Sequence, residues 1–235
     1  FGCSAGGSSV NCLLAAPAAD GLYHKAISHS GTSPTTSPSD VAPLLAKQLK
    51  VATQELPAKL ASMTGPEIFQ AQLKLEARVG ACIDGTVVTR TRPEAFAQSQ
   101  SAGIPYIAGS NRDEGTAFSM LMPDDPNRGN DVFGPVATAA ARRVIEDEDP
   151  SDYLATLQQQ YPNDDPRTLY GYILTDSFRR AAIKNVEAAT TAGVGSWLYR
   201  FDVPSNAMDG KLGAAHGAEM SFTFNTYASK KGLGL

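Results

Sequence analysis

Short apolar runs alternate with longer segments of helical periodicity along most of the chain. The runs at 26–30, 104–109 and 196–201 are rich in apolar or aromatic side chains and end at glycine or polar turn residues, which predicts strands. Strands separated by helical segments predict an α/β protein with a mainly parallel central sheet flanked by helices. Helices are expected over 9–16, 41–49, 56–63, 66–76, 93–100, 137–146, 152–160 and 167–190.

Three strands are few for a chain of 235 residues. We therefore expect that other strands of the sheet, the N-terminal ones among them, are not in this sequence or come from another chain, because an incomplete sheet leaves its edges and core uncovered. On this interpretation, residues 1–235 are part of a single α/β domain.

Composition excludes several classes of function. The net charge of −4 argues against a broad basic surface and therefore against nucleic acid as a partner. No uninterrupted apolar stretch reaches the ~18 residues of a membrane span. Three cysteines, Cys3, Cys12 and Cys82, at unmatched spacings argue against a disulfide framework and a zinc site. A single disulfide, between Cys3 and Cys12 or between Cys12 and Cys82, stays open, although free thiols are favoured. No cofactor is expected.

The N-terminal segment Gly2–Gly6 reads G-C-S-A-G and fits the pattern G-x-S-x-G. In this pattern a serine lies on a tight strand-to-helix turn, and the glycines remove side chains that would collide there. The following apolar run predicts a helix whose N-terminus points at Ser4, and the Ala5 N–H is then a donor for an oxyanion. A Gly/Ser-rich loop without function is the alternative.

Further motifs follow in a fixed order and resemble the type-B carboxylesterase and cholinesterase family of the α/β-hydrolase fold. The resemblance covers most of the chain and implies a Ser-Glu-His triad that hydrolyses carboxylic esters through an acyl-enzyme. The order serine, acid, histidine is the one such a fold requires. Besides the serine motif, the similar segments are Ala26–Gly31, the "D-G" hairpin Cys82–Val88, the acid loop within Ile104–Gly115, the strand Trp197–Phe201 and the histidine loop Gly213–Glu219.

The chemistry requires the same residue types. A serine hydroxyl is a weak nucleophile until a base removes its proton, and a neutral imidazole can do so near pH 7. We assign Ser4 as nucleophile, His216 as base and Glu114 as the acid that fixes the tautomer of the imidazole. Asp113 is the alternative acid.

Two residues are expected to support the triad. The resemblance implies a Ser30 hydroxyl near the acid, although a strand-end serine that caps a turn is nearly as common. Glu219 is similar to the family's acidic residue after the histidine, in a structural role. The sequence departs from the family pattern at Cys3, where a glutamate usually precedes the serine. Cys3 is the less favoured nucleophile, because the turn of the G-x-S-x-G motif exposes its central residue, which is Ser4.

The sequence therefore predicts a metal-free serine hydrolase acting on small to medium carboxylic esters. A non-catalytic cholinesterase-like binding or adhesion domain is the alternative from another class, and it predicts the loss of a triad residue. Another acyl hydrolase, such as an amidase, thioesterase or lipase, is the third reading, since fold and triad do not fix the leaving group. The apolar segments 118–122 and 222–224 line a substrate pocket or simply pack in the core.

Overall fold

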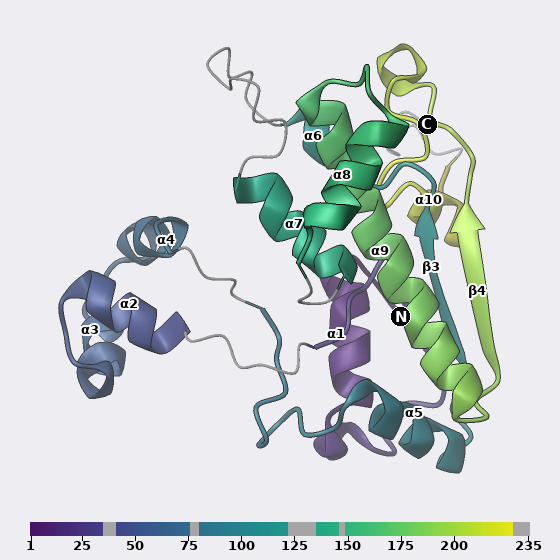
Figure 1. Ribbon diagram of the computed structural model, residues 1–235. Helices are drawn as coiled ribbons and strands as arrows, with labels where there is room; N and C mark the ends of the chain where they lie inside the picture. Colours follow the sequence, from purple (N-terminus) through teal and green to yellow (C-terminus); the bar gives the residue numbers. More distant parts are fainter. Residues whose placement is uncertain (35–40, 76–79, 122–134, 146–148, 228–235) are drawn as a thin grey trace.

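The protein is described from a computed structural model, which describes residues 1–34, 41–75, 80–121, 135–145 and 149–227 (Figure 1). The strands are β1 (Gly2–Cys3), β2 (Ala26–His29), β3 (Tyr106–Asn111) and β4 (Ser196–Phe201). The α-helices are α1 (Ala5–Leu14), α2 (Val41–Leu49), α3 (Leu56–Ala61), α4 (Gly65–Leu73), α5 (Arg92–Ser101), α6 (Thr116–Met120), α7 (Pro135–Ile145), α8 (Ser151–Gln160), α9 (Pro166–Thr191) and α10 (Glu219–Thr223).

The four strands form one parallel sheet in the order β1-β2-β3-β4. Cys3 pairs with His29, Ala26 with Tyr106, and Tyr106 with Ser196, so neighbouring strands run in step. Because all four strands are parallel, their carboxyl ends meet at one edge of the sheet, and the loops that leave them lie together there. The predicted parallel α/β class is confirmed.

Two helices hold the sheet on one side. Helix α1 packs on β1 and β2, and the 26-residue helix α9 packs on β3 and β4 (Figure 1). Tyr106 of β3 is 1% exposed, contacts the Phe96 ring of α5 edge-on and donates a hydrogen bond to Asn11 of α1 at 2.9 Å. This buried cluster ties β3 to two helices and fixes the sheet beneath the loops.

Helices outside this layer form two smaller clusters. Helices α7 and α8 pack with the N-terminal half of α9 around Ile173, which is fully buried. Helices α2, α3 and α4 pack around Leu45, Ala46 and Leu56 as a small unit beside the sheet (Figure 1). A hollow of about 430 Å³ lies between α2 and α4.

Two predictions differ from the structure by more than small shifts at the ends of elements. Helix α1 begins at Ala5 rather than at residue 9, because the chain turns into the helix directly after Ser4, through Gly6 and Gly7. The expected "D-G" hairpin is a turn: the Asp84 side chain accepts hydrogen bonds from the N–H groups of residues 86–88 at 2.8–3.0 Å. Such an Asx turn satisfies those donors without a strand ladder.

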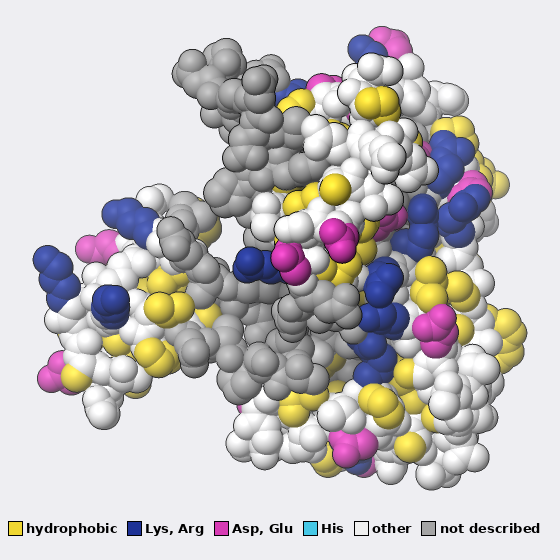
Figure 2. Space-filling model, viewed as in Figure 1, with side chains coloured by type: hydrophobic (Ala, Val, Ile, Leu, Met, Phe, Trp, Pro, Cys, Tyr) yellow, Lys and Arg dark blue, Asp and Glu magenta, His cyan; other side chains and the backbone are white. Residues whose placement is uncertain are grey.

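The described surface carries mixed charge. Figure 2 shows a short row of basic side chains over α9 among acidic and apolar ones. Within α9, Arg179 forms an ion pair with Asp176 at 4.0 Å. No helix in the described ranges is long and apolar enough to cross a membrane. All three cysteines are free thiols.

Candidate active site

Ser4 lies on a strained turn between β1 and α1. Its backbone has φ 58° and ψ −121°, a conformation that a non-glycine residue holds only when its surroundings enforce it. Gly2 makes the turn possible, since a Cβ there would lie 2.2 Å from the carbonyl of Gly6. Gly7 allows a close approach to the next strand, because a Cβ there would lie 2.6 Å from the His29 carbonyl oxygen.

Backbone hydrogen bonds fix the position of Ser4 from both sides. Its N–H donates to the His29 carbonyl at 2.9 Å, and its carbonyl accepts from the Ser8 N–H at 3.0 Å. Ala5 is the first residue of α1 and is exposed. The first N–H groups of a helix have no carbonyl partner within it, so the Ala5 N–H lies beside the serine at the positive end of the helix dipole.

Glu114 follows β3 and is completely buried. Its Oε1 accepts hydrogen bonds from Ser30 Oγ at 2.5 Å and from the Asn111 N–H at 2.6 Å. Its Oε2 lies 2.5 Å from His216 Nδ1. A carboxylate only accepts hydrogen bonds, so the geometry assigns the ring proton to Nδ1 of His216.

The other ring nitrogen of His216 is available for chemistry. Nε2 is buried and has no hydrogen-bond partner in the described part of the chain. Two aromatic rings hold the imidazole: Phe178 stacks on it at 4.7 Å between centroids, and Phe118 lies at 5.1 Å. Phe178 comes from the middle of α9, and its helical spacing in the sequence is that of an ordinary core position, so no local signal marks it.

Asp113, the alternative acid, lies elsewhere. Its Oδ2 accepts a hydrogen bond from the Ala214 N–H at 2.8 Å, and its own N–H donates to the Ala214 carbonyl at 3.0 Å. The Arg112 guanidinium pairs with it at 3.0 Å. Of the two neighbouring carboxylates, only Glu114 contacts the imidazole among the described contacts.

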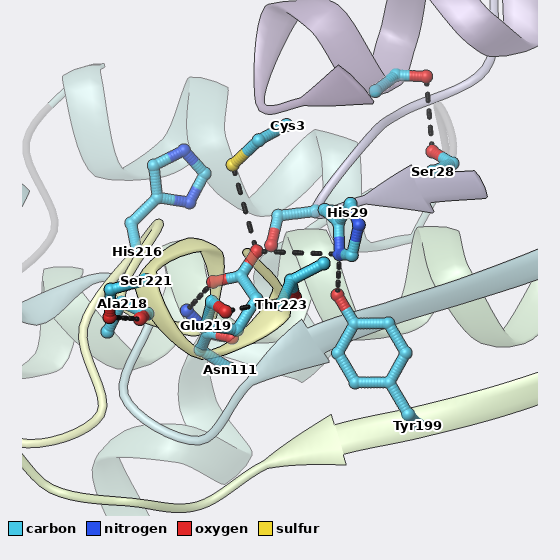
Figure 3. Close-up of polar contacts among 12 residues, drawn as sticks. Cys3, Ser28, His29, Asn111, Tyr199, His216, Ala218, Glu219, Ser221 and Thr223 are labelled. Carbon is cyan, nitrogen blue, oxygen red and sulfur yellow. Dashed lines mark hydrogen bonds and ion pairs between the residues drawn. The ribbon is translucent and has the colours of Figure 1, made fainter. Parts of the chain in front are cut away.

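A second polar cluster joins Cys3, the residue before the serine, to residues of β2, β3, β4 and α10 (Figure 3). Glu219 is 3% exposed, and its Oε2 accepts from Asn111 Nδ2 at 2.6 Å. The Cys3 thiol is directed at Glu219 Oε1 at 3.7 Å, and His29 Nδ1 lies 3.8 Å from the same oxygen. His29 Nδ1 also forms a 2.6 Å hydrogen bond with the Tyr199 hydroxyl. Sequence reasoning assigned no site role to His29, Tyr199 or Asn111.

Burial disfavours the charged forms of Cys3, His29 and Tyr199 in this cluster. Desolvation, followed by the charges of Glu219 and Glu114, raises the pKa of the Cys3 thiol to about 12. The same causes hold the pKa of Tyr199 far above its usual range. Burial lowers the pKa of His29, and the nearby Glu219 opposes this only in part. A thiol that stays protonated is a poor nucleophile, which argues against the Cys3 alternative.

The described apolar side chains of the segments 118–122 and 222–224 are not buried in the core, since Phe222 and Phe224 are 37% and 47% exposed. Phe118 contacts His216, whereas Leu121 is 81% exposed and Met122 lies outside the described residues. Phe222 packs against Phe201 at 5.1 Å between centroids. Among the described residues, no group of three His, Cys, Asp or Glu side chains is arranged to hold a metal ion.

Comparison with known proteins gives a consistent result. The carboxylesterase family profile matches residues 1–233. The chain is 30% identical to the para-nitrobenzyl esterase of Bacillus subtilis, over 95% of this chain and 45% of that protein. It is 25% identical to carboxylesterase 1C of Mus musculus, over 99% of this chain and 46% of that protein. The chain thus spans about half the length of these curated relatives.

Solved structures agree. A para-nitrobenzyl esterase structure superposes with a TM-score of 0.69 at 25% identity, covering 96% of this chain and 46% of that one. The carboxylesterase of Geobacillus stearothermophilus superposes with a TM-score of 0.63 at 19% identity, which supports the α/β-hydrolase fold alone. With a family match over nearly all of its residues and this fold, the chain belongs to the carboxylesterase family.

Proposed function

We propose that the protein is a serine carboxylesterase that cleaves small to medium carboxylic esters through an acyl-enzyme. Ser4 is the nucleophile, His216 the base and Glu114 the acid. One observation supports this most: Glu114 Oε2 lies 2.5 Å from His216 Nδ1, while Nε2 is buried and has no hydrogen-bond partner among the described residues. A carboxylate at Nδ1 favours the tautomer that carries its proton there, which leaves Nε2 as the nitrogen that takes a proton from a serine.

In the first half-reaction, Ser4 Oγ attacks the ester carbonyl carbon and its proton moves to His216 Nε2. The carbonyl oxygen becomes an oxyanion, which the Ala5 N–H stabilises with the positive end of α1. The tetrahedral intermediate expels the alkoxide, which takes the proton from Nε2, and an acyl-Ser4 ester remains. In the second half-reaction, water gives its proton to Nε2 and attacks this ester, and the carboxylic acid leaves as the proton returns to Ser4 Oγ.

Two further residues support the triad in this proposal. Ser30 donates to Glu114 Oε1 and therefore holds the buried acid in its orientation toward His216. Glu219 holds the segment after the histidine through its hydrogen bond with Asn111. Neither residue contacts the reacting atoms, so both are positioning residues.

The test is active-site labelling of the full-length protein with a fluorophosphonate, mapped by peptide mass spectrometry, alongside hydrolysis of p-nitrophenyl acetate and butyrate. We expect one adduct, on Ser4, and loss of both label and turnover in Ser4→Ala. Cys3→Ala is the matched control next to the serine and should keep the label. A well-folded protein with neither label nor turnover would refute the proposal and favour a non-catalytic binding domain.

A further inference from the structure

Two loops at the carboxyl edge of the sheet are joined by hydrogen bonds that the triad itself does not use. The acid loop comprises residues 111–114, at and just after the end of β3, and the histidine loop comprises residues 213–219, after β4. The loops are 102 residues apart at Glu114 and His216. Among the described residues, four hydrogen bonds besides the triad contact connect them: two are donated by Asn111, and two join Asp113 and Ala214, one in each direction.

Asn111 holds the histidine loop on both sides of the imidazole. It is fully buried, and its Nδ2 donates to the Ala215 carbonyl and to Glu219 Oε2, each at 2.6 Å. Ala215 directly precedes His216, and Glu219 follows three residues later. Both partners are acceptors, so this position needs two N–H groups on one short side chain, which asparagine supplies and aspartate or serine does not.

Asp113 holds the loop one residue further back. Its carboxylate accepts from the Ala214 N–H at 2.8 Å, and its N–H donates to the Ala214 carbonyl at 3.0 Å. Gly213, with φ 62°, permits this approach, because a Cβ there would lie 2.4 Å from Asp113 Oδ2. The two side chains thus fix the backbone at 214 and 215, immediately before the histidine.

We propose that Asn111 and Asp113 are positioning residues that clamp the histidine loop, so that the His216 imidazole stays in line with Ser4 and Glu114. This proposal rests on the function proposed above. In the part of the chain that the structure describes, the imidazole Nε2 has no hydrogen-bond partner, so the described contacts that orient the ring are those with Glu114, the two phenylalanines and the backbone of its loop. A displacement on the order of 1 Å can reduce a rate by about 10²-fold.

The experiment compares four variants of the full-length protein with wild type. Asn111→Asp keeps the side-chain shape and removes both N–H donors, while the backbone contact from residue 111 to Glu114 is untouched. Asp113→Ala removes the acceptor, whereas Asp113→Asn keeps an oxygen that can accept from the Ala214 N–H and serves as the conservative rescue. Asn185→Asp is the matched control: Asn185 is equally buried, but its Oδ1 accepts from Ser33 at 2.7 Å and lies outside both loops.

We expect Asn111→Asp and Asp113→Ala to lower kcat for p-nitrophenyl butyrate by 10- to 100-fold, with KM within about twofold of wild type. The rate of fluorophosphonate labelling of Ser4 should fall by the same factor, and the low-field proton resonance of the His216–Glu114 hydrogen bond should broaden or shift. Asp113→Asn should recover most of the lost kcat. Asn185→Asp should lower the unfolding temperature without changing kcat of the folded protein.

Several results would overturn the clamp. One is a kcat within twofold of wild type for the folded Asn111→Asp and Asp113→Ala proteins. Another is an unchanged proton resonance, or equal losses in Asp113→Asn and Asp113→Ala. If Asn111→Asp does not fold, the Asp113 pair decides alone. Turnover that survives in Ser4→Ala would refute the proposed triad itself, which is a different outcome from an inactive Ser4→Ala with normal clamp variants.

Discussion

Replacing Glu114 by glutamine tests the proposed triad most sharply, because the change is nearly isosteric. In the wild type, Oε1 accepts from Ser30 and from the Asn111 N–H, and Oε2 accepts from His216. In Glu114→Gln the amide oxygen has to remain opposite the two donors. The amide NH₂ then faces His216 Nδ1, which becomes the acceptor, so the ring proton moves to Nε2.

An imidazole with its proton on Nε2 cannot accept the serine proton. We therefore expect kcat to fall on the order of 10⁴-fold, which corresponds to about 5 kcal/mol of lost transition-state stabilisation. KM should change little, since Glu114 is completely buried and cannot contact the ester. The free energy of unfolding should also change little, because the amide keeps the two hydrogen bonds of Oε1 and reverses the direction of the third.

The assay is steady-state hydrolysis of p-nitrophenyl butyrate together with the rate of fluorophosphonate labelling and a thermal unfolding curve. Asp20→Asn is the control, because it makes the same acid-to-amide change in a surface ion pair with Arg90. A Glu114→Gln enzyme with kcat within tenfold of wild type would show that this carboxylate does not set the tautomer, and the acid would then have to be sought elsewhere.

Three further predictions concern stability and reactivity. Gly115→Ala should destabilise the fold by several kcal/mol, since the new Cβ would lie 1.9 Å from the Gly171 carbonyl oxygen. Gly65→Ala is the control: it lies in open space at the start of a helix and should be neutral or stabilising by about 0.5–1 kcal/mol. Thermal unfolding of both variants checks this prediction. Burial lowers the pKa of His29 in the folded protein, so between this lowered pKa and the unfolded value of about 6.5 the unfolded chain binds more protons than the folded one. The free energy of unfolding should therefore fall as pH drops through this interval. Urea unfolding at pH 7 and pH 5 checks this, and the fall should be smaller in His29→Gln than in wild type. Iodoacetamide should alkylate Cys3 roughly 100-fold more slowly at pH 8 than an ordinary free cysteine, and rapid, selective loss of this thiol would contradict the raised pKa.

The class of the fold and the order of the candidate site residues follow from the sequence alone. The apolar runs became β2, β3 and β4 within two residues of their predicted bounds. In β2 and β3 the reason is burial, which makes the pattern of a parallel strand continuously apolar, whereas in β4 aromatic and branched side chains carry the signal although Trp197 and Leu198 are exposed. The G-x-S-x-G pattern identified the strained turn at Ser4, since its first glycine, Gly2, lies where a Cβ would meet the Gly6 carbonyl. These are local constraints, and a linear pattern records them.

Tertiary structure alone decided between neighbouring side chains and brought distant ones together. Asp113 and Glu114 are adjacent acidic residues after the same strand, but their side chains point to different parts of the histidine loop. Asp113 contacts the backbone of Ala214, and Glu114 contacts the His216 imidazole, 102 residues away in the sequence. Phe178 reaches the imidazole because α9 crosses the sheet beneath the histidine loop. Asn111 contacts Ala215 and Glu219 only once β3 and β4 are paired. Such contacts depend on strand register and helix packing across the whole sheet, and no local periodicity encodes them.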